Sequence, residues 1–171
     1  MHANDQGESR MTGWSEQPSV VAAMLNPALI AALLASTAEG HAKETSQGVP
    51  VVLSFVAAPL ALHRGTREAL PASTATHLAT WVSRNPVLRA GLPQRAVSLV
   101  EPVRAGIRFG LAHDVLSLDR DRLSAVPRKR PRGVRPPPQL NEVLRKANLV
   151  GRWLAKTDSP ATVLALLGVA P

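Results

Sequence analysis

Cysteine and tyrosine are absent from this 171-residue chain, and aromatic residues make up only 3% of it. Without cysteine the chain cannot form disulfide bonds or bind a metal through thiolates. Because so few rings are present, the core must be built from leucine, valine and alanine, which favours helices. The scarcity of rings also argues against a single-stranded nucleic-acid binder that stacks several bases. The aromatic residues are Trp14, Trp81, Trp153, Phe55 and Phe109.

Signals for export and membrane insertion are missing as well. The first residues are polar, without the basic start and apolar core of a signal peptide. The longest nearly apolar run, residues 20–35, is interrupted by Asn26 and Pro27 and is too short to span a bilayer. Hydrophobic residues make up 45% of the chain and charged residues 19%, which predicts a packed domain. We therefore expect one cytoplasmic domain.

No sequence pattern indicates catalysis. The chain contains neither the glycine-rich phosphate loop of P-loop ATPases nor the G-x-S-x-G elbow of serine hydrolases. No two histidines have the spacing that places metal ligands on one helix face. They are His2, His41, His63, His77 and His113. We therefore expect a protein that is not an enzyme and that uses no metal or cofactor.

Positive charge is concentrated in one short segment. The formal net charge is +8, and residues 127–138 (PRKRPRGVRPPP) hold five basic residues and no acidic one. The prolines predict that this segment is a stiff linker. We therefore divide the chain into a flexible tail at residues 1–18, a helical domain at 19–126, the basic linker at 127–138 and a C-terminal helical pair at 139–171.

Capping residues predict several helix ends. Asn26 and Pro27 favour the start of a helix, which Gly40 is expected to end. Ser73 or Thr74 is expected to cap a second helix, which ends before the next Asn-Pro pair.

Prolines mark the helices that follow. Pro86 begins a helix that is expected to reach about residue 100, with a kink at Pro93, and Pro102 begins another. After the linker, a long helix is expected over residues 139–158, followed by a short final helix capped by Ser159.

A hairpin completes the expected fold. Residues 115–118 and 123–126 indicate two strands joined by a polar turn. Three helices followed by a hairpin is the order of a winged helix, so we predict a mainly α, winged-helix-like domain with a C-terminal helical extension. Residues 49–62 fit a buried strand or a buried helix, because periodicity does not separate the two at this length, and we slightly favour the helix.

Several cations occupy places from which a winged helix contacts DNA. Arg104 and Arg108 lie one turn apart on the helix before the hairpin, and Arg120 and Arg122 lie in its turn. The alternative is a solvated basic face offset by two neighbouring aspartates. The linker cations either bind phosphates or belong to a simple spacer. The nucleic-acid candidates are Arg104, Arg108, Arg120, Arg122, Arg128, Lys129, Arg130, Arg132 and Arg135.

Three apolar side chains are candidates for contact with a partner protein. Leu149 and Trp153 lie one turn apart, nearly opposite the main apolar stripe of the 139–158 helix, and Phe109 is similarly off the stripe of its own helix. Such side chains either pack within the domain or anchor it in a partner's groove, and tryptophan is an efficient interface anchor.

Most of residues 26–171 resembles the middle components of bacterial three-component ABC systems. The resemblance rests on NPALIAALL (26–34), PLALHRGTREALPASTATHLATWVSRNPVL (59–88), FGLAHDVLSLD (109–119), GRWLAK (151–156) and SPATVLALLGVAP (159–171). The family motif matches this chain at His63, Thr66, Arg67, Leu70 and Pro71. The resemblance assigns these residues no role, and residues 66–71 could simply form a structural turn.

The resemblance implies a small non-catalytic protein encoded with an ABC ATPase of the SMC or RecN type and with a third, effector-like component. Such systems are thought to counter invading genetic elements. Our leading hypothesis is therefore an adaptor that joins the ATPase to the effector. We expect that this adaptor does not associate with a membrane. The alternative hypothesis is a winged-helix DNA-binding protein or regulator.

Overall fold

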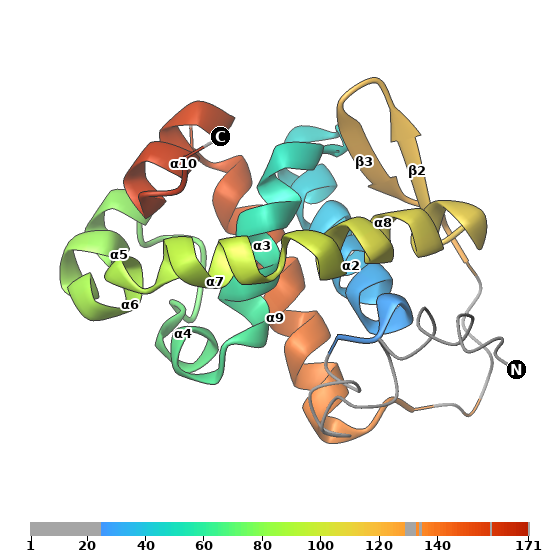
Figure 1. The fold of residues 1–171 in the computed structure, drawn as a ribbon, viewed down its shortest axis with the longest axis horizontal. Helices are drawn as coiled ribbons and strands as arrows, with labels where there is room; N and C mark the ends of the chain where they lie inside the picture. The colour runs from blue at the N-terminus through green and yellow to red at the C-terminus, as the bar shows by residue number, and fades with distance from the viewer. Residues whose placement is uncertain (1–24, 129–132, 134, 158, 171) are drawn as a thin grey trace, which may run out of the picture.

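The computed structural model describes residues 25–128, 133, 135–157 and 159–170. The described chain is mainly helical, with one small antiparallel sheet at one end (Figure 1). The predicted mainly α fold is therefore confirmed. None of the described helices is both long and apolar enough to cross a bilayer. The predicted tail and much of the basic linker lie outside the described residues.

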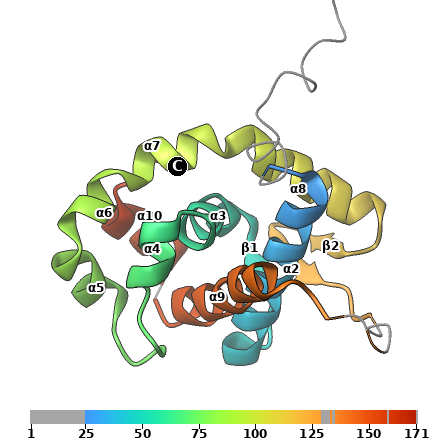
Figure 2. The same cartoon turned by 90° about the horizontal axis from the view of Figure 1, so that it is seen from below.

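Helices α2 (Pro27–Thr45) and α9 (Pro138–Ala155) pack against each other at the centre of the fold (Figure 2). The predicted start of α2 is confirmed, because Asn26 Oδ1 accepts a hydrogen bond of 2.8 Å from Ala28 N–H. The predicted end at Gly40 is wrong. The helix continues to Thr45, and Ser46 ends it in the left-handed conformation with φ 58°.

Gly40 lies inside α2 because α9 passes very close to it. A Cβ atom on Gly40 would lie 2.0 Å from the carbonyl oxygen of Asn148, and one on Gly151 would lie 1.9 Å from that of Thr37. Each helix thus contributes a glycine where the other's backbone approaches, and no larger residue fits at either position without a shift. Asn148 also donates to the Ser36 carbonyl at 3.1 Å.

Residues 49–62 form a strand, a 3-10 turn and a helix in succession: β1 (Val49–Pro50), η1 (Val51–Leu53) and α3 (Ser54–Leu62). The predicted helix is confirmed for most of the segment, and the short strand was missed. Strand β1 pairs antiparallel with β3, and this pairing depends on residues more than 70 positions away in the sequence. A two-residue strand has too little local pattern to be predicted.

Several short helices connect α3 to the hairpin: α4 (Arg64–Ala69), α5 (Leu78–Arg84), α6 (Pro86–Ala90), α7 (Leu92–Ser98) and α8 (Val100–Ala112). Helix α4 was not predicted, and α8 begins at Val100 rather than at the predicted Pro102. The predicted caps at Ser73 and Thr74 are wrong, because α5 begins later, with His77 at its N-cap. The predicted kinked helix is also wrong. It is divided near Gly91, so that Pro93 lies in the first turn of α7, where proline removes no helical hydrogen bond.

The predicted hairpin is confirmed as β2 (Leu116–Asp119) and β3 (Arg122–Ala125). Arg120, in the turn, has a φ of 55°. The sheet order is β1-β3-β2, so β1 adds a third strand to the hairpin. Whether these elements constitute a winged helix stays a prediction.

The C-terminal elements share the core of the preceding helices. Helix α9 is followed by α10 (Pro160–Leu167), whose predicted cap is confirmed by a 3.1 Å hydrogen bond from Thr162 N–H to Ser159 Oγ. Buried side chains from α2, α3, α8, α9 and α10 form one hydrophobic cluster, which includes Leu33, Leu60, Val103, Leu154 and Val163. The packing therefore holds α9 in a fixed position relative to α2.

Candidate partner-binding surface

A basic hollow lies on the outer side of α9. Its volume is about 320 Å³, and it is lined by Ala72, Arg145, Lys146, Asn148, Leu149 and Arg152. Arg145, Leu149 and Arg152 follow one another at spacings of four and three, which places them on one helix face. We call this site the α9 hollow. It presents two aliphatic side chains and one amide among three cationic side chains.

The opposite wall of the α9 hollow belongs to the loop between α4 and α5, and two tryptophans fix that loop in place. Trp153 Nε1 donates to the Thr76 carbonyl at 2.6 Å, and Trp81 Nε1 donates to the Ala69 carbonyl at 2.7 Å. Their rings meet edge to face, with centroids 5.5 Å apart. Trp153 on α9 therefore holds the loop at Thr76, and Trp81 on α5 holds the end of α4 at Ala69.

Trp153 is a core residue and offers almost no surface to a partner protein. Its side chain is only 2% exposed and belongs to the hydrophobic core. The structure therefore decides for burial, one of the two alternatives that the sequence left open. Leu149 is half-buried in the α9 hollow, and Phe109 is half-buried with its ring centroid 4.2 Å from that of His113. A partner-binding role for Leu149 and Phe109 stays a prediction.

The α9 hollow carries positive charge with little compensation. Arg152 Nε lies 2.8 Å from Glu44 Oε1, and this hydrogen bond from Arg152 holds the pKa of Glu44 below its usual value. Among the described residues, no carboxylate lies within 4.0 Å of Arg145 or Lys146. Two cations of the hollow therefore remain available to an acidic ligand.

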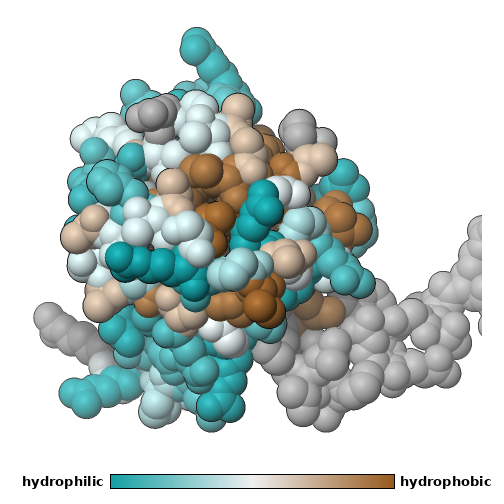
Figure 3. Space-filling model, turned by 90° about the vertical axis from the view of Figure 1, so that its left-hand side faces the viewer, coloured by the Kyte–Doolittle hydropathy of each residue, from teal (hydrophilic) through white to brown (hydrophobic). Residues whose placement is uncertain are grey.

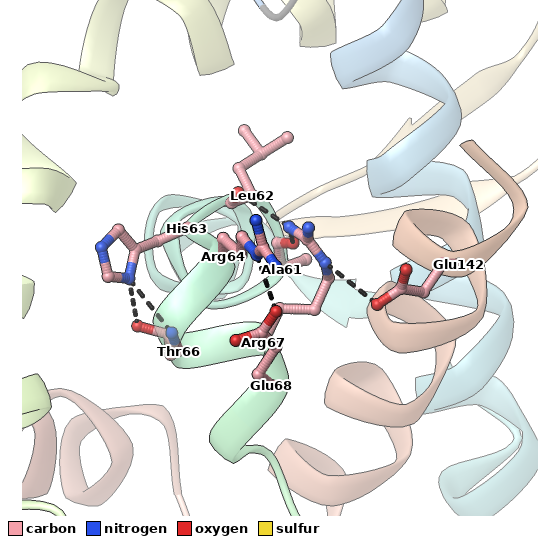
Figure 4. Close-up of polar contacts among 8 residues, drawn as sticks. All are labelled: Ala61, Leu62, His63, Arg64, Thr66, Arg67, Glu68 and Glu142. Atoms are coloured by element: carbon pink, nitrogen blue, oxygen red, sulfur yellow. Dashed lines mark hydrogen bonds and ion pairs between the residues drawn. The ribbon is translucent and has the colours of Figure 1, made fainter. Parts of the chain in front are cut away.

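The family motif at residues 59–71 forms a polar corner between α3 and α4 (Figure 4). His63 Nδ1 accepts from Thr66 N–H at 3.1 Å and lies 2.8 Å from Thr66 Oγ1, so the imidazole caps α4. Arg67 Nη1 donates to the carbonyl groups of Ala61 and Leu62 at 3.0 and 2.9 Å, at the end of α3. These contacts favour a structural role for the motif, although residues 64–69 form helix α4 rather than a turn.

Arg67 also connects this corner to α9. Its Nε lies 3.5 Å from Glu142 Oε1, and its side chain is 14% exposed. We expect Arg67→Ala to lower the free energy of unfolding by about 2 kcal/mol, because two buried carbonyl groups lose a charged donor. Urea denaturation would measure the change.

Arg64 provides a matched control on the same helix. It pairs with Glu68 at 2.7 Å, but its side chain is 83% exposed. Arg64→Ala is therefore expected to cost much less stability than Arg67→Ala. Equal losses for the two variants would show that the Arg67 contacts do not stabilise the corner.

Two histidines make the fold sensitive to mild acid. Burial lowers the pKa of His63, as do the nearby Arg95 and Arg67, and burial also lowers the pKa of His41. Below the ordinary histidine pKa of 6.5, the unfolded chain therefore binds more protons than the folded chain. Stability is expected to be complete above pH 6.5 and to fall as the pH drops below it.

This pH dependence can be checked by urea denaturation between pH 7.5 and pH 5.5, a range above the ordinary glutamate pKa of 4.5. His63→Asn keeps a capping oxygen but does not titrate, so this variant should lose less stability than the wild type over the same range. An identical pH profile for both proteins would contradict the assignment to His63.

The DNA-binding candidates are distributed over several environments. Arg108 and Arg120 are exposed, Arg104 pairs with Glu101 at 2.6 Å, and Arg122 is half-buried and donates to the Gly48 carbonyl at 3.0 Å. The carbonyl group of His113 accepts a hydrogen bond from Arg128, and Arg135 is exposed. The predicted sites at Lys129, Arg130 and Arg132 lie outside the described residues.

Comparison with known proteins identifies the family. Residues 14–171 match the model of a family described as ABC-three component (ABC-3C) system Middle Component 3. The chain belongs to this family. No curated protein and no solved structure matches the chain. A middle component of a multi-component system has partner components by definition. Its exposed surfaces are where those partners can bind.

The basic side chains of this middle component's α9 hollow were not among the predicted partner-binding residues. Arg145, Lys146 and Arg152 surround Leu149 in the sequence, and that spacing could have indicated a shared surface. The participation of Ala72 had no local signal, because it depends on how the α4–α5 loop packs. Within the described residues, no group of three metal-ligating side chains comes together.

Proposed function

We propose that this middle component is a non-catalytic adaptor that links an ABC ATPase of the SMC or RecN type to an effector component in a system that counters invading genetic elements. Membership of the middle-component family is the observation that carries the proposal. The α9 hollow supports it, because its accessible cations, of which Arg145 is exposed and Lys146 and Arg152 are half-buried, and its half-buried leucine suit a protein contact.

The arrangement of the helices gives an adaptor two separate faces. Helix α2 packs against both α8 and α9, and Figure 2 shows α2 next to each of them. The α9 hollow and the exposed side of α8 could thus contact different partners at once. The shared core keeps the two faces in a fixed relation.

Co-expression with the ATPase and effector encoded beside this chain would test the adaptor function. We expect one complex to co-elute in size-exclusion chromatography, and omission of this chain should separate the other two components. If the wild-type chain binds neither component, the adaptor proposal fails.

Leu149→Asp is expected to weaken the ATPase contact, because a carboxylate would lie where the hollow offers an aliphatic side chain. Val97→Asp is the control. Val97 on α7 is 73% exposed and does not line the α9 hollow.

Apolar and polar side chains are mixed on the side of the molecule formed by α5, α6 and α10 (Figure 3), so exposed apolar atoms are not confined to the hollow.

DNA binding is the second candidate function, and the exposed arginines of α8 and the hairpin turn favour it. Phosphate contacts weaken steeply as salt concentration rises. Arg108→Ala should therefore reduce both the affinity for duplex DNA and the salt dependence of that affinity. Arg84→Ala, at an exposed position of α5, should change neither. Arg108 is preferred to Arg104 for this test because Arg104 already pairs with Glu101. If neither Arg108→Ala nor Arg84→Ala alters DNA binding, α8 does not contact the DNA.

A further inference from the structure

We propose that the α9 hollow receives an acidic segment of a partner protein, with an aliphatic side chain of that segment placed against Leu149. This inference rests on the proposed adaptor function, because it names the chemistry of one partner contact. It adds that the contact is electrostatically selective and that the partner contributes the carboxylates.

The charge of the lining selects the sign of the ligand. Arg145, Lys146 and Arg152 supply three cations, and the only carboxylate paired with the lining in the described residues is Glu44. The surplus of positive charge attracts carboxylates and repels a basic segment. Glu44 holds Arg152 in a fixed position at one end of the hollow, while Arg145 and Lys146 can pair with the ligand.

The apolar part of the lining favours a peptide over a nucleic acid. Leu149 and Ala72 are aliphatic, and none of the described aromatic side chains lines the hollow for a base to stack on. An acidic peptide can satisfy both parts, because its carboxylates reach the cations while an aliphatic side chain covers Leu149. A volume of about 320 Å³ suits a few side chains rather than a folded domain.

The walls of the hollow are already in place without a ligand. Asn148 is bonded to the Ser36 carbonyl and Trp153 to the Thr76 carbonyl, so both α9 and the facing loop are anchored. The close approach at Gly40 and Gly151 prevents α9 from shifting toward α2. A pre-formed site loses little conformational entropy when it binds a flexible segment.

The test uses a short fluorescent peptide of alternating glutamate and leucine, titrated with the full chain and read by anisotropy. Charge reversal at the hollow, Arg145→Glu with Lys146→Glu, is expected to weaken binding at least tenfold. The matched control is Arg128→Glu with Arg135→Glu, which changes the net charge equally, but both positions lie in the basic linker. Circular dichroism of each variant would verify that it is folded.

Peptides with altered composition separate the two parts of the site. A version with serine in place of leucine should bind more weakly, and one with lysine in place of glutamate should not bind. Equal losses from the hollow and linker variants, or binding that is independent of leucine, would overturn the proposal in favour of nonspecific charge attraction. Tighter binding of a single-stranded oligonucleotide at the same hollow residues would also overturn it.

The three-component complex distinguishes this inference from the adaptor proposal. If the wild-type complex forms and survives Arg145→Glu with Lys146→Glu, the adaptor function stands and the acidic-segment site is wrong. If the wild-type chain forms no complex, the adaptor function itself is wrong. Loss of the complex in the hollow variant, with retention in the linker variant, supports both.

Discussion

Trp153→Ala is expected to lower the free energy of unfolding by about 3–5 kcal/mol, the typical cost of removing a large aromatic side chain from a core. Trp153 is 2% exposed and meets the ring of Trp81 edge to face. The change leaves a cavity and also leaves the Thr76 carbonyl without its indole donor. Urea or thermal denaturation of the isolated chain would measure the loss.

Trp153→Phe should cost less, about 1–2 kcal/mol, because it retains most of the volume but loses the indole hydrogen bond. A Trp153→Ala variant as stable as the wild type would contradict the buried position of this side chain.

The expected instability of Trp153→Ala also affects binding experiments. If Trp153→Ala abolishes a complex, the loss reports the α4–α5 loop and the core rather than a direct contact with the partner.

Gly151→Ala is expected to destabilise the protein by about 3 kcal/mol, near the upper end of the range for overpacked cores. The added methyl group would lie 1.9 Å from the Thr37 carbonyl oxygen, and a backbone atom cannot move aside as a flexible side chain can. Helix propensity alone predicts the opposite sign, a gain of about 1 kcal/mol. Denaturation experiments would therefore separate the two effects by sign.

Gly65→Ala is the control for this prediction. Gly65 is exposed on α4, and the nearest atom to an added Cβ is His63 Cε1 at 3.2 Å, at the end of a side chain. In Gly65→Ala the gain in helix propensity should roughly offset this tight contact, so the stability of the protein should change little. Gly40→Ala should behave like Gly151→Ala, because its Cβ would lie 2.0 Å from the Asn148 carbonyl oxygen. A stabilised Gly151→Ala protein would show that α2 and α9 are not in such close contact.

The elements predicted correctly are those whose signals are local. Asn26 caps α2 and Ser159 caps α10 as the sequence indicated, because a capping side chain bonds a backbone group two or three residues away. The hairpin was predicted from two short apolar runs around a polar turn, and β2 and β3 follow that pattern closely.

The incorrect predictions share a different cause. Gly40 was interpreted as a helix end, but its small size serves the contact with α9. Ser73 was interpreted as a cap, whereas its hydroxyl accepts from Ala75 N–H in the loop before α5. Trp153 fitted both a core position and a partner contact until the structure placed it beside Trp81. Each residue type allows several roles, and only the surrounding structure selects one.

Local signals in the sequence predict the mainly helical class, the hairpin, two of the helix caps and the resemblance to the middle-component family. These properties follow from residue type, short-range spacing and ordered motifs. The tertiary structure alone decided the third strand, the burial of Trp153 and the α9 hollow, which joins Ala72 to residues on α9 more than 70 positions later. The physical reason is that side-chain packing and charge pairing act through space, between segments whose separation along the chain carries no local pattern.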